Sequence, residues 1–282
     1  MLPIKPVVMS NGVSMPPAVM STRRMNYREM KAAVMAGLKA GFRAFDTARD
    51  YGPEEPIVGR VMKECLCELG LKREDIFLTT KIGNGQQIEA NISEQIDISL
   101  RHLQTDYVDL WLMHWPLPGY YLETWKKMEE VYKSGKVRSI GLANPRVRHL
   151  KAFYDARSKV PLHCVHFEMH PFRTCQDIVS FCRERSIAIQ SYAPFCYMIP
   201  KVREDPVLNQ IAGETGHTLG QVVLRWHYQH NYVPVFGTRK PDRAKENFGM
   251  FGFELNQGQM ERIDALNQDY KFHLESVHCP GF

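Results

Sequence analysis

The sequence lacks a cysteine framework and any long hydrophobic run. Seven cysteines are scattered over 282 residues without a CxxC pair, which argues against a disulfide scaffold and for a reducing compartment such as the cytoplasm. No apolar run reaches the ~20 residues that a membrane-spanning helix needs. The N-terminal stretch MLPIKPVVMSNGVSMPP has no signal-peptide apolar core. We therefore expect a cytoplasmic protein without a membrane partner.

An excess of one charge is also missing. The formal net charge is +5, from 36 basic and 31 acidic residues, and no dense Lys/Arg block occurs. A nucleic-acid partner is therefore not expected, whereas small anionic ligands stay compatible with the mild positive charge.

Several nucleotide, metal and nucleophile motifs are absent. There is no GxGxxG after a strand, no GxxxxGK[ST], no HExxH and no GxSxG. These absences argue against a Rossmann domain, a P-loop, a zincin helix and a nucleophile elbow.

What the sequence does contain is a regular alternation of strand and helix patterns. Expected strands cover 18–22, 42–47, 76–81, 108–114, 137–143, 164–169, 187–192 and 233–238. Expected helices cover 26–39, 54–68, 87–103, 123–134, 146–156, 175–184, 206–229 (one or two helices) and 241–250. Eight strand-then-helix units predict a closed parallel barrel, the (β/α)8 TIM barrel of the α/β class. We expect a single domain over residues 1–282, with an N-terminal β-hairpin at 5–16 plugging the bottom and an extra C-terminal helix at 255–267.

Polar residues follow the second, third and fourth expected strands. Asp46 ends GFRAFD and Tyr51 lies five residues further on, while Lys81 ends FLTTK and His114 ends YVDLWLMH. The carboxyl ends of barrel strands are where such folds place their chemistry. A single residue of this kind is more often a loop cap or a surface group, but four on three successive strand ends favour a site.

These four residue types suit proton transfer to a carbonyl oxygen. A phenol has a pKa of about 10, and a nearby ammonium favours the phenolate and lowers that pKa. The carboxylate of Asp46 would keep Lys81 charged and in position, and an imidazole N–H of His114 would orient the substrate oxygen. The hydride would have to come from elsewhere.

One segment permits a different interpretation. His166, Glu168 and His170 alternate along the expected strand at 164–169 and just beyond it, so they would face the same side. Two histidines and a carboxylate can hold zinc or iron, as in a metal-dependent barrel hydrolase. The alternative is a polar strand end inside a barrel. The resemblance described next explains the segment better, and we assign no metal.

Ordered motifs along nearly the whole chain, from Asn11 to about Leu255, resemble the aldo-keto reductase family. They are NGVSMP, FDTARDY with Gly59 downstream, LTTK, DYVDLWLMHWP, GKVRSIGLAN, FEMHP, SYAPF and GTRKPDRAKEN. The resemblance implies that Asp46, Tyr51, Lys81 and His114 form the catalytic tetrad, with Tyr51 as the proton donor.

The resemblance also implies a nicotinamide cofactor across the barrel mouth. Tyr192 would stack on the nicotinamide ring, Asn144 and His166 would hold the carboxamide, and Thr238 and Arg243 would hold the adenosine 2′-phosphate. The implied cofactor-binding set is Thr22, Asn144, His166, Tyr192, Thr238, Arg239, Arg243, Glu246 and Asn247, the last two at the adenine.

Departures from the family pattern affect this site. Gly237 stands where a lysine is usual, Ala143 replaces a serine and His166 replaces a glutamine. The phosphate clamp and the nicotinamide anchor would therefore be altered. Arg239 and Lys240 lie close enough to replace the missing lysine, so NADPH (NADP+) is expected rather than NADH.

A further departure concerns the substrate. Arg23 stands where a tryptophan is common, and Arg23, Asp50 and Trp115 would line the pocket mouth. An apolar wall would become a charged one, which predicts a polar or anionic carbonyl substrate. The alternative is that Arg23 points to solvent. The short tail after Leu266 predicts an open pocket without a long lid.

The expected function is thus an NADPH-dependent oxidoreductase that reduces the aldehyde or ketone of a small polar molecule to an alcohol. The alternative is a nicotinamide-binding sensor or regulatory protein on the same fold with little catalysis. We expect a monomer or a weak homo-oligomer.

Overall fold

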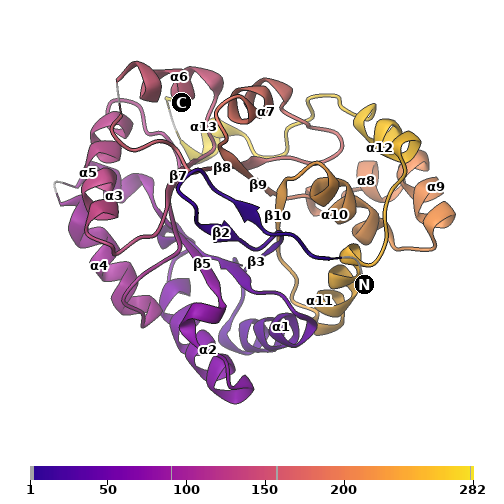
Figure 1. Cartoon of the computed structure of the whole chain (residues 1–282), viewed down its shortest axis with the longest axis horizontal. Coiled ribbons are helices and arrows are strands. Elements are labelled where there is room, and N and C mark those ends of the chain that lie inside the picture. Colours follow the sequence, from indigo (N-terminus) through magenta and orange to yellow (C-terminus); the bar gives the residue numbers. More distant parts are fainter. Residues whose placement is uncertain (1–2, 90, 157, 280) are drawn as a thin grey trace.

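Eight parallel strands close into a barrel in the computed structural model, which describes residues 3–89, 91–156, 158–279 and 281–282. The strand order is β10-β3-β4-β5-β6-β7-β8-β9, so the first barrel strand pairs with the last (Figure 1). The predicted (β/α)8 fold is confirmed. Within the described ranges, no helix is both long and apolar enough to cross a membrane.

The strands and helices alternate as the sequence predicts. The barrel strands are β3 (Val19–Ser21), β4 (Ala44–Asp46), β5 (Phe77–Ile82), β6 (Leu110–Met113), β7 (Ile140–Ala143), β8 (Cys164–Glu168), β9 (Ala188–Tyr192) and β10 (Val233–Phe236). The helices of three turns or more are α1 (Tyr27–Ala40), α2 (Glu54–Leu69), α4 (Ile92–Leu103), α5 (Tyr121–Lys133) and α10 (Leu219–Gln229). Shorter helices are α3 (Asn84–Ile88), α6 (Val147–Asp155), α7 (Gln176–Arg183), α8 (Pro200–Arg203), α9 (Pro206–Thr215), α11 (Pro241–Phe248), α12 (Gln257–Asp264) and α13 (Glu275–His278).

The N-terminal hairpin lies across one end of the barrel, as predicted. Its strands β1 (Val7–Val8) and β2 (Ser14–Met15) cross the centre of the ring in Figure 1. Met9 and Met15 are buried among side chains that point into the barrel, such as Phe77 and Leu110. The hairpin thus shields the barrel interior from water at the amino-terminal ends of the strands.

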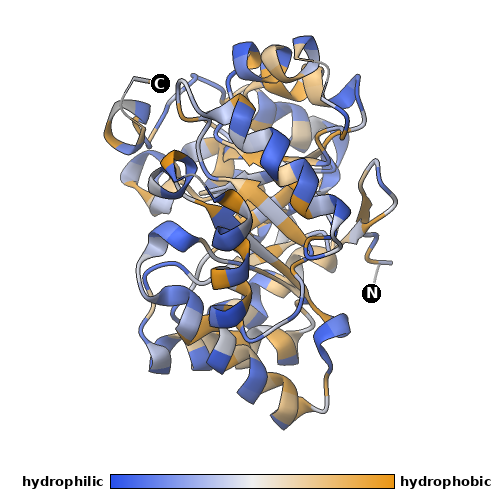
Figure 2. Ribbon diagram, turned by 90° about the vertical axis from the view of Figure 1, so that its left-hand side faces the viewer, coloured by the Kyte–Doolittle hydropathy of each residue, from blue (hydrophilic) through white to orange (hydrophobic). Residues whose placement is uncertain are grey.

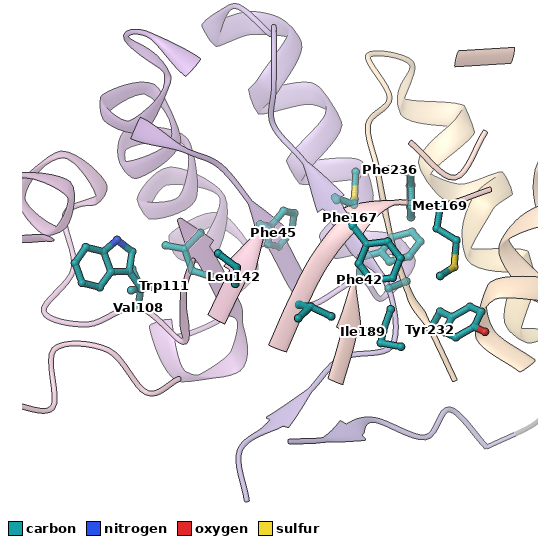
Figure 3. Close-up of a cluster of buried hydrophobic side chains, with 14 of the residues drawn as sticks. Phe42, Phe45, Val108, Trp111, Leu142, Phe167, Met169, Ile189, Tyr232 and Phe236 are labelled. Atoms are coloured by element: carbon teal, nitrogen blue, oxygen red, sulfur yellow. The ribbon is translucent and has the colours of Figure 1, made fainter. Parts of the chain in front are cut away.

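Successive strand residues serve two separate cores, because side chains alternate across a sheet. Inward residues such as Ala44 and Leu112 fill the barrel. Outward residues such as Phe45 and Trp111 pack against the surrounding helices. Figure 2 shows hydrophobic residues gathered along the strands, and Figure 3 shows part of the layer between barrel and helices. The same alternation places Asp46, two residues after Ala44, on the inner face at the carboxyl end.

Gly59 fixes how α2 meets α4. A Cβ atom at this position would lie 2.3 Å from the carbonyl oxygen of His102 and 2.7 Å from the carbonyl carbon of Leu103. Backbone atoms at that distance cannot yield without moving a helix, so only glycine allows this approach.

The helices differ from the prediction at two places. The helix predicted at 87–103 is divided into α3 and α4, because the Asn91 side chain accepts a hydrogen bond from the Glu94 amide and so begins a new helix. In addition, the tail after α12 forms the short helix α13, which the sequence did not predict.

Candidate active site

A cavity of about 690 Å³ opens at the carboxyl-terminal ends of the barrel strands. Asp46, Tyr51 and His114 line it on one side, and Asn144, His166 and Tyr192 line it on another. Four of these six residues end a strand or follow one directly, His166 lies within β8, and Tyr51 lies in the short 3-10 helix η1 (Arg49–Tyr51) after β4. The sequence therefore located the cavity correctly.

Asp46 and Lys81 form a buried ion pair beneath this cavity. The Lys81 ammonium donates to both carboxylate oxygens of Asp46, at 2.8 and 2.6 Å, and to the Thr47 carbonyl at 2.9 Å. Burial lowers the pKa of Lys81, but the contacts with Asp46 and Tyr51 outweigh burial and raise it above its ordinary value. Lys81 is thus charged at neutral pH and held by three acceptors.

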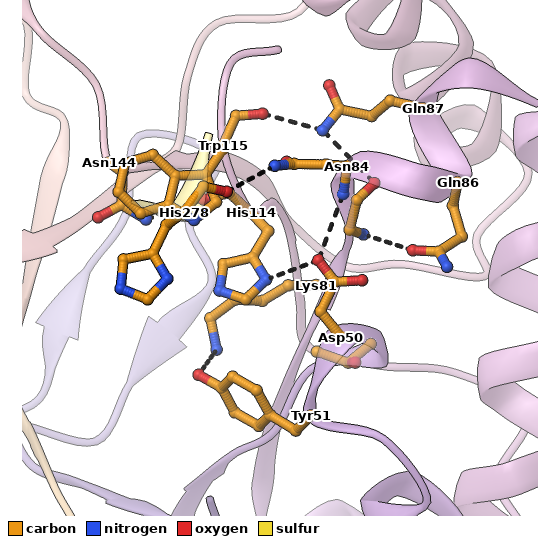
Figure 4. Close-up of polar contacts among 12 residues, drawn as sticks. Asp50, Tyr51, Lys81, Asn84, Gln86, Gln87, His114, Trp115, Asn144 and His278 are labelled. Carbon is orange, nitrogen blue, oxygen red and sulfur yellow. Dashed lines mark hydrogen bonds and ion pairs between the residues drawn. The ribbon is translucent and has the colours of Figure 1, made fainter. Parts of the chain in front are cut away.

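Tyr51 lies next to this pair. Its hydroxyl is 3.5 Å from the Lys81 ammonium, within reach of a hydrogen bond (Figure 4). Burial raises the pKa of Tyr51 above 10, although the charge of Lys81 acts in the opposite direction. The expected lowering of the pKa by Lys81 is thus present, but the net shift of the Tyr51 pKa is upward. Burial exceeds the effect of Lys81, because Asp46 neutralises much of that charge.

His114 approaches Asp50, a contact the sequence did not reveal. Its Nδ1 atom lies 3.4 Å from a carboxylate oxygen of Asp50 (Figure 4), longer than a full hydrogen bond. Burial lowers the pKa of His114, while Asp50 acts to raise it. A Cβ atom on Gly83 would lie 1.7 Å from Asp50, so the glycine after β5 leaves the space that this carboxylate occupies.

On the opposite side, Asn144, His166 and Tyr192 form one connected group. The Tyr192 hydroxyl donates to the side-chain oxygen of Asn144 at 2.6 Å, and Asn144 donates to the His114 carbonyl at 2.9 Å. The His166 ring stacks on Tyr192 at 5.1 Å and lies 2.9 Å from the side-chain oxygen of Gln190. Burial lowers the pKa of His166 to about 4, so the ring is neutral at pH 7.

The far end of the cavity lies beside the loop after β10. Thr238, Arg239 and Arg243 line it near the start of α11. Thr22, Glu246 and Asn247 do not belong to the lining: Thr22 bonds the Asp46 carbonyl, and Glu246 accepts from Thr218. The structure therefore brings six of the nine predicted cofactor residues to the cavity wall.

Arg23 and Trp115 also line the cavity, together with Asp50, as the sequence predicts. The guanidinium carbon of Arg23 lies 5.3 Å from the centre of the Tyr51 ring. The interpretation in which Arg23 points to solvent was therefore wrong.

The tail is the part of the site that sequence reasoning missed. His273, Val277 and His278 line the cavity, and His278 stacks on Trp115 at 5.8 Å. The sequence predicts an open pocket without a long lid and does not assign the tail to the cavity wall. Glu168 explains the difference, because its carboxylate accepts hydrogen bonds from the backbone N–H groups of Phe272 and His273, at 2.6 and 2.8 Å.

The metal alternative finds no support in these contacts. Glu168 holds the tail and lies 3.3 Å from His170, while His166 bonds Gln190. Across the described ranges, no group of three or more His, Cys, Asp or Glu residues is placed to hold a metal ion.

Comparisons with known proteins agree with this geometry. The model of the Aldo/keto reductase family matches residues 15–197 and 200–268. A glyoxal reductase of Bacillus subtilis is 37% identical over 265 residues, and the methylglyoxal reductase DkgA of Escherichia coli K12 is 31% identical over 264 residues, each match covering 93% of both chains. A silkworm (Bombyx mori) aldo-keto reductase solved with NADPH is 26% identical, covers 96% of this chain and 90% of its own, and superposes with a TM-score of 0.89. The chain belongs to the aldo/keto reductase family of oxidoreductases.

Proposed function

We propose that the chain is a single-domain NADPH-dependent reductase that converts small polar aldehydes or ketones to alcohols. The observation that carries this proposal is a chain of contacts: Lys81 forms a buried ion pair with Asp46 and also contacts the Tyr51 phenol, which lines the cavity. The names of its glyoxal and methylglyoxal reductase relatives support a small polar carbonyl.

The residues at the cavity suit a nicotinamide dinucleotide, which would supply the hydride. At one end, Arg243 and Thr238 lie near the N-terminus of α11, where partial positive charge and donors favour a phosphate. At the other end, the Tyr192 ring offers a flat surface. Gly237 contributes no charge, so in this proposal Arg243 binds the 2′-phosphate with Arg239 beside it.

His166 can replace the usual glutamine as an acceptor. Gln190 presents its side-chain oxygen to Nδ1 of His166, so Nδ1 must carry the proton of this neutral ring. The other ring nitrogen, Nε2, is then an acceptor, and a carboxamide N–H can donate to it. In this respect the exchange of glutamine for histidine conserves the hydrogen bond that a nicotinamide needs.

Tyr51 and His114 then act on the substrate. Because its pKa is raised, Tyr51 holds its proton at neutral pH and can donate it to the carbonyl oxygen as negative charge develops there. Lys81 stabilises the phenolate that remains. His114 presents the ring nitrogen that faces away from Asp50, and this nitrogen donates a hydrogen bond to the carbonyl oxygen when it carries the ring proton.

Steady-state oxidation of NADPH with glyoxal and methylglyoxal tests the proposal. Tyr51→Phe should lower turnover about 100-fold or more and leave the Kd for NADPH unchanged, since only a hydroxyl is lost. Tyr120→Phe, which removes a hydroxyl from an exposed side chain, is the control. Full turnover by Tyr51→Phe would contradict the assignment. NADPH binding without any turnover in the wild type would instead support the sensor alternative.

A further inference from the structure

Arg23 is a cation in the cavity wall that has no carboxylate partner among the described residues. It follows β3, it is half-buried, and its guanidinium lies over the edge of the cavity nearest Tyr51. Among the described residues, the only hydrogen bond of Arg23 is from its backbone N–H to the Ser21 hydroxyl, at 3.4 Å. Partial burial of a charge costs free energy unless an opposite charge or hydrogen-bond acceptor meets it, so this position suits an anion.

The neighbouring carboxylates are already in use. Asp46 is paired with Lys81, and Asp50 contacts His114 and accepts from the Asn84 amide at 3.3 Å. Glu54 accepts from the Arg24 amide at 2.6 Å. None of these three lies within the 4.0 Å of Arg23 that defines an ion pair. The protein therefore leaves the charge of Arg23 available to a ligand.

The tail supplies the facing wall without adding a charge. Burial lowers the pKa of His273 to about 4, and burial also lowers the pKa of His278, so both rings are neutral at pH 7. The Tyr197 hydroxyl and a His273 ring nitrogen are 2.9 Å apart, which fixes this ring at the mouth. Arg23 is then the charged group that an anionic substrate would meet beside Tyr51.

We propose that the substrate is a carbonyl compound that carries a carboxylate, and that the Arg23 guanidinium binds this carboxylate while Tyr51 faces the carbonyl oxygen. This inference rests on the reductase function proposed above. A planar guanidinium can donate two parallel hydrogen bonds to a carboxylate. Because Arg23 lies 5.3 Å from the Tyr51 ring centre, the acid and the carbonyl should be separated by only a few bonds.

The test compares kcat/KM for 4-oxobutanoate and for its methyl ester, which have the same reacting aldehyde but differ in charge. We expect wild type to prefer the acid. Arg23→Ala should lose about 10- to 100-fold in kcat/KM for the acid, the range for a hydrogen-bonded charge, and change little for the ester. Arg23→Lys should recover part of the loss. Arg28→Ala removes one exposed charge from α1 and should leave the ratio unchanged.

Three other results would overturn the inference or separate it from the proposed function. Equal losses for acid and ester in Arg23→Ala would mean that Arg23 acts through Tyr51 alone. A weaker Kd for NADPH with an unchanged acid-to-ester ratio would assign Arg23 to the dinucleotide. If wild type reduces neither of these compounds nor glyoxal and methylglyoxal, the proposed function fails. Calorimetric titration with butanoate, which requires no turnover, then decides whether Arg23 binds a carboxylate, and absence of Arg23-dependent binding overturns the inference by itself.

Discussion

Each end of the barrel buries a carboxylate that is paired with a cationic side chain, but of these two clusters only the one at the carboxyl-terminal ends adjoins the active-site cavity. At the amino-terminal ends of the strands, Asp109 accepts from Arg73 and Arg138, both at 2.8 Å, and from the Leu78 amide at 2.9 Å. At the carboxyl-terminal ends, the Asp46 carboxylate accepts hydrogen bonds from Lys81 alone among the described residues, and Lys81 also contacts the Tyr51 hydroxyl.

The two clusters differ in what their cationic side chains contact besides the carboxylate. The Asp109 carboxylate links the amino-terminal ends of β5, β6 and β7. Its partners Arg73 and Arg138 reach the protein surface, where their side chains are 21% and 49% exposed. Lys81 is fully buried and its third contact is a titratable phenol at the cavity wall. A buried ion pair therefore marks a candidate site only when it adjoins a proton-carrying group and a space for a ligand.

Of the substitutions considered, replacement of Lys81 should have the largest effect on stability and activity. Lys81→Met leaves Asp46 buried without a counter-charge, which should cost about 3–5 kcal/mol of unfolding free energy and abolish measurable reduction. Denaturant unfolding and NADPH oxidation measure the two effects. The double variant Asp46→Asn with Lys81→Met removes the unpaired charge, so stability should recover in part while activity does not. Recovery of activity in the double variant would contradict the role given to Lys81.

Asp109→Asn is the matched change at the other end. The loss of the charge-assisted hydrogen bonds should lower the unfolding free energy by about 2 kcal/mol, moderated because both arginines can reach water. The kcat of the folded enzyme should equal that of wild type, since Asp109 does not belong to the lining of the active-site cavity. A selective fall in kcat without loss of stability would show that the two clusters are coupled.

A smaller effect is expected at His166. His166→Leu removes the acceptor proposed for the carboxamide and should weaken NADPH binding about 5- to 10-fold, as expected for one neutral hydrogen bond. His166→Gln restores an acceptor and should bind NADPH like wild type. Fluorescence titration measures both, and equal affinities for the leucine and glutamine variants would show that this hydrogen bond does not form.

The smallest effect on activity is expected from Glu168, which holds the tail. Burial raises the pKa of Glu168, but hydrogen bonds from His170 and from the Phe272 and His273 amides outweigh burial and lower it below 4.5. The stabilisation from this carboxylate is thus present above pH 4.5 and is lost as the pH falls through the lower, folded value. We expect Glu168→Gln to speed hydrogen exchange at the two amides and to raise KM a few-fold, with kcat unchanged. Unaltered exchange would mean that other contacts hold the tail.

The sequence was sufficient to predict the eight strands and the residues that surround the cavity. Strand periodicity fixes which side chains point inward, and a closed barrel brings all strand ends to one rim, so Asp46, Tyr51 and His114 had to meet. The contact between Glu168 and the tail joins residues more than 100 positions apart, and no local pattern reveals it. The sign of the Tyr51 pKa shift depends on burial, which residue identities alone do not determine.

Closure of the barrel through β3 and β10 has a consequence for folding. Val19 pairs with Val235 and Met20 with Phe236, so the first barrel strand, which also pairs with β4, finds its second partner only after more than 200 further residues have been synthesised. Arg239 donates to the Arg24 carbonyl across the same seam. The wall that contains both Arg23 and the loop before α11 thus exists only in the fully assembled ring, and a chain truncated before β10 should lose the ligand cavity together with the last step of folding.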